Sequence, residues 1–105
     1  MDFQEAVNNF AQACTDRHQE WCDKHMGEDY ENKTVYRVKQ GKRWTKILYC
    51  TNGSESGSVH SFIDTNGDVY KPASWQAPAK HVRGNIFKHN HADMLDDYGH
   101  LGWIR

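Results

Sequence analysis

The 105-residue chain carries 26% charged and 37% hydrophobic residues, with a formal net charge of -1 at pH 7. A chain this short builds one modest core, so we expect a single domain over 1–105, and its 12% aromatic residues must supply much of the apolar area. No apolar run approaches the roughly 20 residues of a membrane-spanning helix, and the acidic start Met1-Asp2-Phe3 does not match a signal peptide. We therefore expect a cytoplasmic protein with no membrane partner.

The first 27 residues predict an amphipathic helix. Asp2 and Glu5 are spaced as in a capping box, and Gly27 suits a C-terminal stop. The apolar residues that recur at helical spacing between them are Phe3, Val7, Phe10, Cys14, Trp21 and Met26. Such a stripe is typical of a helix that packs on a core.

Two segments after the helix predict a β-hairpin. Apolar and charged side chains alternate in two segments, 34–40 (TVYRVKQ) and 43–51 (RWTKILYCT). Gly41-Lys42 between the segments suits a turn. The second segment is partly apolar on both faces, which favours a central strand.

A second hairpin is predicted further along the chain. Residues 58–64 and 68–70 predict its strands, and Asn66-Gly67 between them favours a type I′ turn. Residues 101–105 resemble a closing strand, with Trp103 against the apolar face of the sheet. We therefore expect an α+β fold, in which the N-terminal helix packs on a small antiparallel sheet of four to five strands.

The segment 71–85, KPASWQAPAKHVRGN, contains both prolines of the chain. Pro72 is expected to end the preceding strand, because proline lacks an N–H and biases its predecessor toward extended backbone. Pro78 suits the first position of a helix, and Gly84 suits the position after its end. The segment therefore predicts a stiff strap with a short helical turn near residues 78–83.

The number and spacing of the cysteines and histidines predict neither a disulfide framework nor a definite metal site. The three cysteines form no CxxC pair, so reduced thiols are expected. Two groups have spacings that a metal ion could use, and they are His18, Cys22 and His25 on the helix and His81, His89 and His91 near the C-terminus. Seven histidines in a short chain produce such spacings by chance, so we predict no metal and no cofactor, and we leave both groups open.

Charge is segregated along the chain. Residues 1–33 carry eight acids against three bases, residues 34–88 carry nine bases against three acids, and residues 89–105 carry three acids against one base. One interpretation is internal pairing, in which Lys80 and Arg83 hold Asp16, Glu20 or Asp23 of the helix. The other is an anionic ligand on the basic middle segment.

No enzymatic motif is present in the sequence. It contains no phosphate-binding Walker loop, GxGxxG, HExxH or GxSxG. Asp64 and Asp68 flank a predicted turn, where acids are common for conformational reasons. We therefore predict no catalytic residues and a non-enzymatic protein.

A long motif begins at Phe62 and Asp64 and continues as GDxxKxASWxAPAKxxRGNI from Gly67 to Ile86. Over about residues 34–105 the chain resembles a family of small, uncharacterised tailed-bacteriophage proteins. The resemblance carries no activity. It implies an accessory protein of host takeover or anti-defence in the cytoplasm of an infected bacterium, where such products inhibit host enzymes, sequester immune signalling nucleotides or bind nucleic acid.

The leading hypothesis is capture of a small phosphorylated, nucleotide-like ligand. The start of the helical turn near Ala77 to Lys80 would offer N–H groups to a phosphate, and Trp75 would stack on a base. The predicted ligand-binding residues are Lys71, Ser74, Trp75, Lys80 and Arg83. The structural alternative is that Trp75 caps one end of the core.

Two further hypotheses are kept. The first is nucleic-acid binding by a basic face, with Arg37, Lys39, Lys42, Arg43, Trp44 and Lys46. The pI of about 6.6 counts against it, because dedicated nucleic-acid binders are usually basic. The second is inhibition of a host enzyme through the acidic helix face, and a homodimer is left open.

Overall fold

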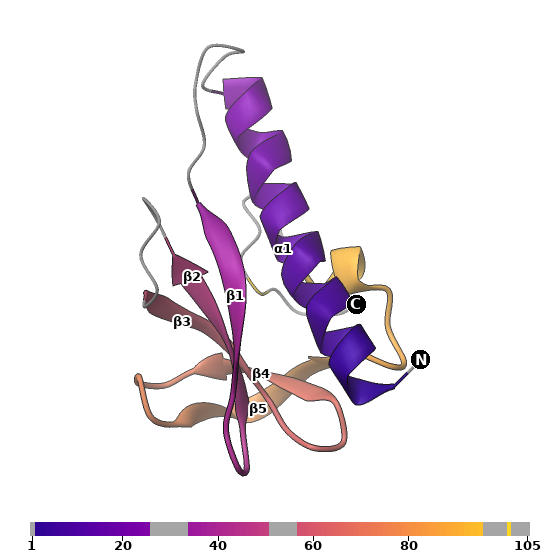
Figure 1. The fold of residues 1–105 in the computed structure, drawn as a ribbon, viewed down its shortest axis with the longest axis vertical. Helices are drawn as coiled ribbons and strands as arrows, with labels where there is room; N and C mark the ends of the chain where they lie inside the picture. Colours follow the sequence, from indigo (N-terminus) through magenta and orange to yellow (C-terminus); the bar gives the residue numbers. More distant parts are fainter. Residues whose placement is uncertain (1, 26–33, 51–56, 96–100, 102–105) are drawn as a thin grey trace.

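The computed structural model describes residues 2–25, 34–50, 57–95 and 101. Its elements are α1 (Phe3–His25), β1 (Val35–Gln40), β2 (Thr45–Cys50), β3 (Ser58–Ile63), β4 (Asp68–Pro72), β5 (Pro78–Asn85) and the 3-10 helix η1 (His91–Met94). The helix lies across one face of a five-stranded sheet (Figure 1). The predicted α+β fold is therefore confirmed. Within the described residues, no helix is long and apolar enough to cross a membrane.

Helix α1 begins at the predicted cap. The Oδ1 of Asp2 accepts a hydrogen bond from the backbone N–H of Glu5 at 2.8 Å, which satisfies a donor left over at the helix start. The predicted end at Gly27 and the last member of the apolar stripe, Met26, lie outside the described residues. The buried residues of α1 are Ala6, Val7, Phe10, Ala11, Cys14 and Cys22.

The sheet is an antiparallel meander in the order β1-β2-β3-β4-β5. Residues that face each other across two strands share one side of a sheet. Tyr36 faces Tyr49 and Val38 faces Ile47, and these four pack with the core against α1. The strands predicted at 34–40, 43–51, 58–64 and 68–70 therefore exist as β1 to β4, with small differences at their ends.

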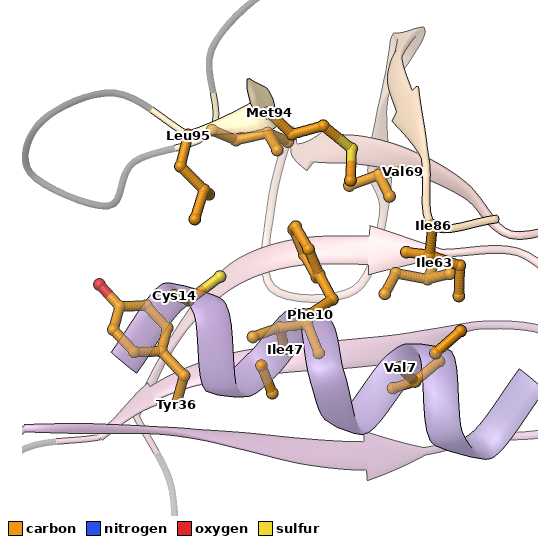
Figure 2. Packing of buried hydrophobic residues seen from close by; sticks show 13 residues of the cluster. Val7, Phe10, Cys14, Tyr36, Ile47, Ile63, Val69, Ile86, Met94 and Leu95 are labelled. Atoms are coloured by element: carbon orange, nitrogen blue, oxygen red, sulfur yellow. The ribbon is translucent and has the colours of Figure 1, made fainter. Parts of the chain in front are cut away.

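The core lies between α1 and the sheet, with Phe10 near its centre (Figure 2). Phe10 is fully buried, and its ring meets His91 edge-on with centroids 5.6 Å apart. Met94 of η1 is also fully buried, and the Nη2 of Arg17 donates to the carbonyl of Ala92 at 3.4 Å. The 3-10 helix therefore covers the side of the core that the sheet leaves open.

Residues 78–83 do not form the predicted helical turn, because Pro78 begins β5. β5 pairs with β4, and Pro72 faces Pro78 next to the loop between the two strands. The carbonyl of Ala77 accepts the N–H groups of the two residues after Pro72, at 2.9 and 3.1 Å. Proline is tolerated at the first residue of an edge strand, so strand pairing outweighs the local helix signals of Pro78 and Gly84.

The predicted type I′ turn at Asn66-Gly67 is also wrong, although the hairpin itself is present. The N–H of Gly67 donates to the carbonyl of Asp64 at 3.0 Å, so the central turn residues are Thr65 and Asn66. Gly67 follows with a φ of 87°, which glycine adopts without strain. The Oδ1 of Asp64 accepts the N–H groups of Asn66 at 2.9 Å and Asp68 at 3.0 Å, and these bonds stabilise the longer loop.

A buried amide links this turn to the end of β5. Asn85 is 5% exposed, and its Nδ2 donates to the carbonyl of Asn66 and to Oδ1 of Asp68, both at 3.0 Å. Its Oδ1 accepts the N–H groups of Phe87 at 2.8 Å and Lys88 at 3.2 Å. The two ends of the sequence motif, Gly67-Asp68 and Gly84-Asn85, therefore have a structural role.

Among the described residues, Leu95 pairs antiparallel with Leu101 in an isolated bridge. Both side chains are buried. The rest of the predicted closing strand, with Trp103, lies outside the described residues.

Candidate ligand-binding face

The sheet has a second, basic face on the side away from α1, which we call the outer face. Lys39 of β1 lies directly opposite Lys46 of β2 in the ladder. Their neighbours in sequence, Val38 and Ile47, face α1, and successive side chains of a strand point to opposite faces, so both lysines point away from the core. Arg37 lies two residues before Lys39 on the same strand, and it shares this face.

The outer face has an aromatic cluster of its own. Phe62 of β3 is fully buried there. Trp44 meets its ring edge-on with centroids 5.9 Å apart, and Trp44 also meets Tyr70 at 5.4 Å. The Nζ of Lys46 lies 5.5 Å from the ring centroid of Phe62. The ammonium group of Lys46 therefore lies within cation–π range of this cluster.

Trp75, in the loop between β4 and β5, reaches the same face. The Nζ of Lys46 lies 4.8 Å and the Nζ of Lys39 lies 5.9 Å from its ring centroid, within the range of a cation–π interaction. The Trp75 side chain is 42% exposed. The predicted alternative in which Trp75 caps the core is therefore wrong.

The contact between Trp75 and β1 requires a strongly curled sheet, because β4 and β5 are the strands furthest from β1 in the meander. Irregular register occurs in β2–β3 at Ile47/Leu48 and twice in β4–β5, around Tyr70. Such bulges increase strand twist and bend the sheet. The loop that carries Trp75 is thereby brought over the lysines of β1 and β2.

Two cavities lie next to this loop. The larger, of about 470 Å³, is lined by Tyr36, Tyr49, Ser58, Val59, His60, Lys71, Pro72 and Leu101. The smaller, of about 290 Å³, is lined by Ser58, Val59, Pro72, Ala73, Ser74 and Trp75. We call them the tyrosine cavity and the tryptophan cavity.

The predicted ligand-binding residues are only partly brought together. Lys71 lines the tyrosine cavity, while Ser74 and Trp75 line the tryptophan cavity. Lys80 is exposed and Arg83 half-buried on β5, and neither is among the described residues that line the two cavities. The proposed phosphate site at the helix start does not exist, because that segment is a strand.

The predicted nucleic-acid face is partly assembled. Arg37, Lys39 and Lys46 share the outer face. Lys42 and Arg43 are exposed in the turn between β1 and β2, where the guanidinium of Arg43 lies 5.7 Å from the ring centroid of Trp44. The lysines that touch Trp75 thus belong to this set and not to the ligand-binding set.

Sequence reasoning found Lys71 but missed the aromatic residues that line the tyrosine cavity. Tyr36 and Tyr49 follow a strand pattern that indicates core packing. In β3 the pairs Ile47↔Ser61 and Leu48↔Val59 leave His60 as an extra residue. This bulge turns the ring of His60 toward Tyr36, with centroids 5.2 Å apart, and alternation alone gives no signal for it.

The histidine and cysteine groups do not assemble into a metal site in the described part of the chain, where no three His, Cys, Asp or Glu side chains gather. His18 lies edge-on to Tyr49 with centroids 5.6 Å apart, and the Nε2 of His91 donates to the carbonyl of Ile86 at 2.9 Å. All three cysteines are buried as free thiols. Burial raises the pKa of Cys14, which keeps this thiol protonated and unreactive.

Ionisation of Tyr70, on the outer face, makes the stability of the fold depend on pH. Burial, followed by the charges of Asp64 and Asp68, raises the pKa of its phenol above the usual value of 10. The native state therefore holds this proton more tightly than the unfolded chain. The contribution of this proton to the free energy of unfolding is fully present below about pH 10, and it is lost as the pH rises through the pKa of Tyr70 in the folded protein.

We expect the Tyr70→Phe variant to lose less free energy of unfolding than the wild type between about pH 9 and pH 11, because it has no phenol to ionise. Urea unfolding at both pH values measures this, with pH 7 as the reference condition. Parallel losses in the two proteins would contradict the assignment to Tyr70.

The match to known families spans nearly the whole chain. One family model covers residues 2–103, and therefore includes α1, the outer face and both cavities; its description is a family of unknown function (DUF7717). The chain belongs to this family. No curated protein and no solved structure matches it. Membership of DUF7717 assigns no activity, so the outer face and the two cavities are the only guide to function in the described residues.

Proposed function

We propose that the protein is a non-enzymatic binder of an anionic, nucleotide-like ligand whose base stacks on Trp75. One observation carries this proposal. The half-exposed ring of Trp75 lies under the ammonium groups of Lys46 at 4.8 Å and Lys39 at 5.9 Å, and it lines a cavity of about 290 Å³. A base stacked on such a ring contributes about 1–3 kcal/mol, and the two lysines supply charge for a phosphate.

The arrangement of the two lysines supports an anionic ligand. Lys39 and Lys46 face each other directly across β1 and β2, and like charges in this position destabilise a sheet. The π-face of Trp75 offsets part of the repulsion. A phosphate between the two ammonium groups would offset more, so ligand binding and sheet stability are coupled at this point.

The resemblance to tailed-phage proteins supplies the setting of the proposal. In it, the protein acts in the cytoplasm of an infected host cell and sequesters a phosphorylated signal. Sequestration requires binding and release without chemistry, which agrees with a site built from stacking and charge.

The test is isothermal titration calorimetry with 5′-AMP, adenosine and inorganic phosphate as probes. The wild type is expected to bind 5′-AMP more tightly than either part. Trp75→Ala should weaken 5′-AMP binding roughly tenfold or more, which corresponds to the loss of about 1–3 kcal/mol of stacking, while Trp75→Phe should retain most of it. Lys39→Gln with Lys46→Gln should weaken 5′-AMP and leave adenosine unchanged.

Two exposed residues away from the site provide matched controls. Phe87 is 48% exposed in the turn after β5, and Lys88 follows it. Phe87→Ala and Lys88→Gln should leave 5′-AMP affinity within about twofold. The proposal fails if 5′-AMP does not bind at millimolar concentration, or if Trp75→Ala binds it as well as the wild type does.

A second candidate function, nucleic-acid binding, is favoured by the way the cations are placed. Arg37, Lys39 and Lys46 lie on one face and continue into Arg43 and Trp44 at the hairpin turn. A single strand laid along this face would touch several phosphates, so its affinity would fall steeply with salt. Increasing affinity for oligonucleotides from about 2 to 10 residues, with a steeper salt dependence for longer ones, would favour this function over capture of a small ligand.

A further inference from the structure

The sheet separates between β3 and β4. In this part of the structure their ladder joins only Phe62 to Tyr70 and Ile63 to Val69. The first half of β3, from Ser58 on, and the end of β4 at Pro72 do not pair with each other. Both cavities lie along this separation.

The two cavities share a rim. Ser58, Val59 and Pro72 line both the tyrosine cavity and the tryptophan cavity. Pro72 also belongs to the short segment that begins with Lys71 in the first cavity and ends with Trp75 in the second. Tyr36 and Tyr49 lie on the α1 side of the sheet, whereas Trp75 lies over the outer face. One extended ligand can therefore enter both cavities only by passing at this rim through the separation between β3 and β4.

The tyrosine cavity has the chemistry of a second planar subsite. The ring of Tyr36 meets Tyr49 edge-on with centroids 5.4 Å apart, and it meets His60 at 5.2 Å. These three rings wall the cavity. Among the described residues that line the two cavities, Lys71 alone carries a full charge, and it is exposed. Aromatic walls with one cation suit a second base and a linking phosphate.

We infer that the ligand is a dinucleotide, with one base on Trp75, the second base among Tyr36, Tyr49 and His60, and the linking phosphodiester beside Lys71. The inference rests on the proposed function, because Trp75 must first hold a nucleotide. Once one base is bound, the second enters its cavity at a high effective concentration, so the affinities combine. In this arrangement, both Lys71 and Trp75 of the sequence motif have a role in binding, Lys71 at the phosphodiester and Trp75 at a base.

The test compares the dinucleotide pApA with 5′-AMP by calorimetry. The wild type is expected to bind pApA at least about tenfold more tightly than 5′-AMP, one molecule per chain. Lys71→Ala should weaken pApA binding more than 5′-AMP binding, and so remove most of this advantage. Trp75→Ala should weaken both ligands. Lys80→Ala, an exposed lysine outside the two cavities, is the matched control and should change neither.

The outcomes separate this inference from the proposed function. Equal affinity for pApA and 5′-AMP overturns the dinucleotide site and leaves nucleotide binding at Trp75 intact. Absence of binding by both ligands overturns the proposed function as well. An affinity that continues to rise from pApA to a ten-residue oligoadenylate also overturns the dinucleotide site, because a two-base site gains nothing from further residues.

Discussion

Replacing Phe10 with alanine is expected to lower the free energy of unfolding by about 3–5 kcal/mol. The side chain is fully buried, and its ring lies among the groups that join α1 to the rest of the core. It meets His91 at 5.6 Å and His60 at 6.3 Å between ring centroids. Its removal leaves a cavity between the helix, β3 and the segment around η1, which these fixed elements cannot collapse to fill.

Urea unfolding followed by far-UV circular dichroism measures this loss. Phe87→Ala removes the same side chain from an exposed position, where its ring meets Phe3 at 6.4 Å, and it should cost about 1 kcal/mol or less. Equal losses in the two variants would show that Phe10 is not a central core residue. If Phe10→Ala does not fold, Phe10→Leu provides the smaller step, and it should still cost more than Phe87→Ala.

The second large effect is expected at Asn85, where alanine should cost about 2–4 kcal/mol. The buried amide makes four hydrogen bonds that connect the loop after β3 with the turn after β5. Without it, the four bonds are lost together from a partly buried site, and the turn after β5 is no longer tied to the loop after β3. Each such bond contributes about 0.5–1.5 kcal/mol, so the combined loss is large.

The Asn8→Ala variant is the matched control for Asn85→Ala. Asn8 is exposed on α1, where its Oδ1 accepts one hydrogen bond from Gln4 at 3.1 Å, and its loss should cost about 0.5 kcal/mol or less. Asn85→Asp is informative as well. It would place a carboxylate beside Oδ1 of Asp68, so its stability should improve as the pH falls and carboxylates are protonated. A stability of Asn85→Ala close to that of the wild type would contradict the structural role of the motif ends.

The sequence predicted the parts of the fold that depend on local pattern. The cap at Asp2, the apolar stripe around Phe10 and the alternation in residues 34–40 each follow from one element and its own periodicity. The α+β class follows from their order. These features needed no knowledge of which strands would be neighbours.

The two errors in secondary structure occurred where strand pairing or a side-chain bond overrides the signal of a short motif. Pro78 and Gly84 obey helix rules, yet the chain between them pairs with β4. Asn66-Gly67 has the composition of a two-residue turn, yet Asp64 extends the loop by accepting two N–H groups. At β5 the partner is a strand earlier in the chain, whereas Asp64 lies only two residues before Asn66, so its bonds are a local feature that the Asn-Gly rule does not include.

The candidate site was half predictable for a similar reason. Trp75 and Lys71 stood out by composition and motif, and the structure places each beside a cavity. The lysines over Trp75 come from β1 and β2, about 30 residues earlier in the sequence, and only the bulged, curled sheet brings them there. No single-sequence pattern encodes that curl.

The contact between α1 and η1 has a consequence for the order of folding. Neighbouring strands of the meander are joined by short sequence separations, so the hairpins can form early. The bond from Arg17 to Ala92 closes a loop of most of the chain, and the contact of Phe10 with His91 does the same. During synthesis, α1 leaves the ribosome first and can pack on β1 early, but the core around Phe10 stays incomplete until residues 91–95 have been made. The first element of the chain therefore reaches its full native environment only when the last described segments are in place.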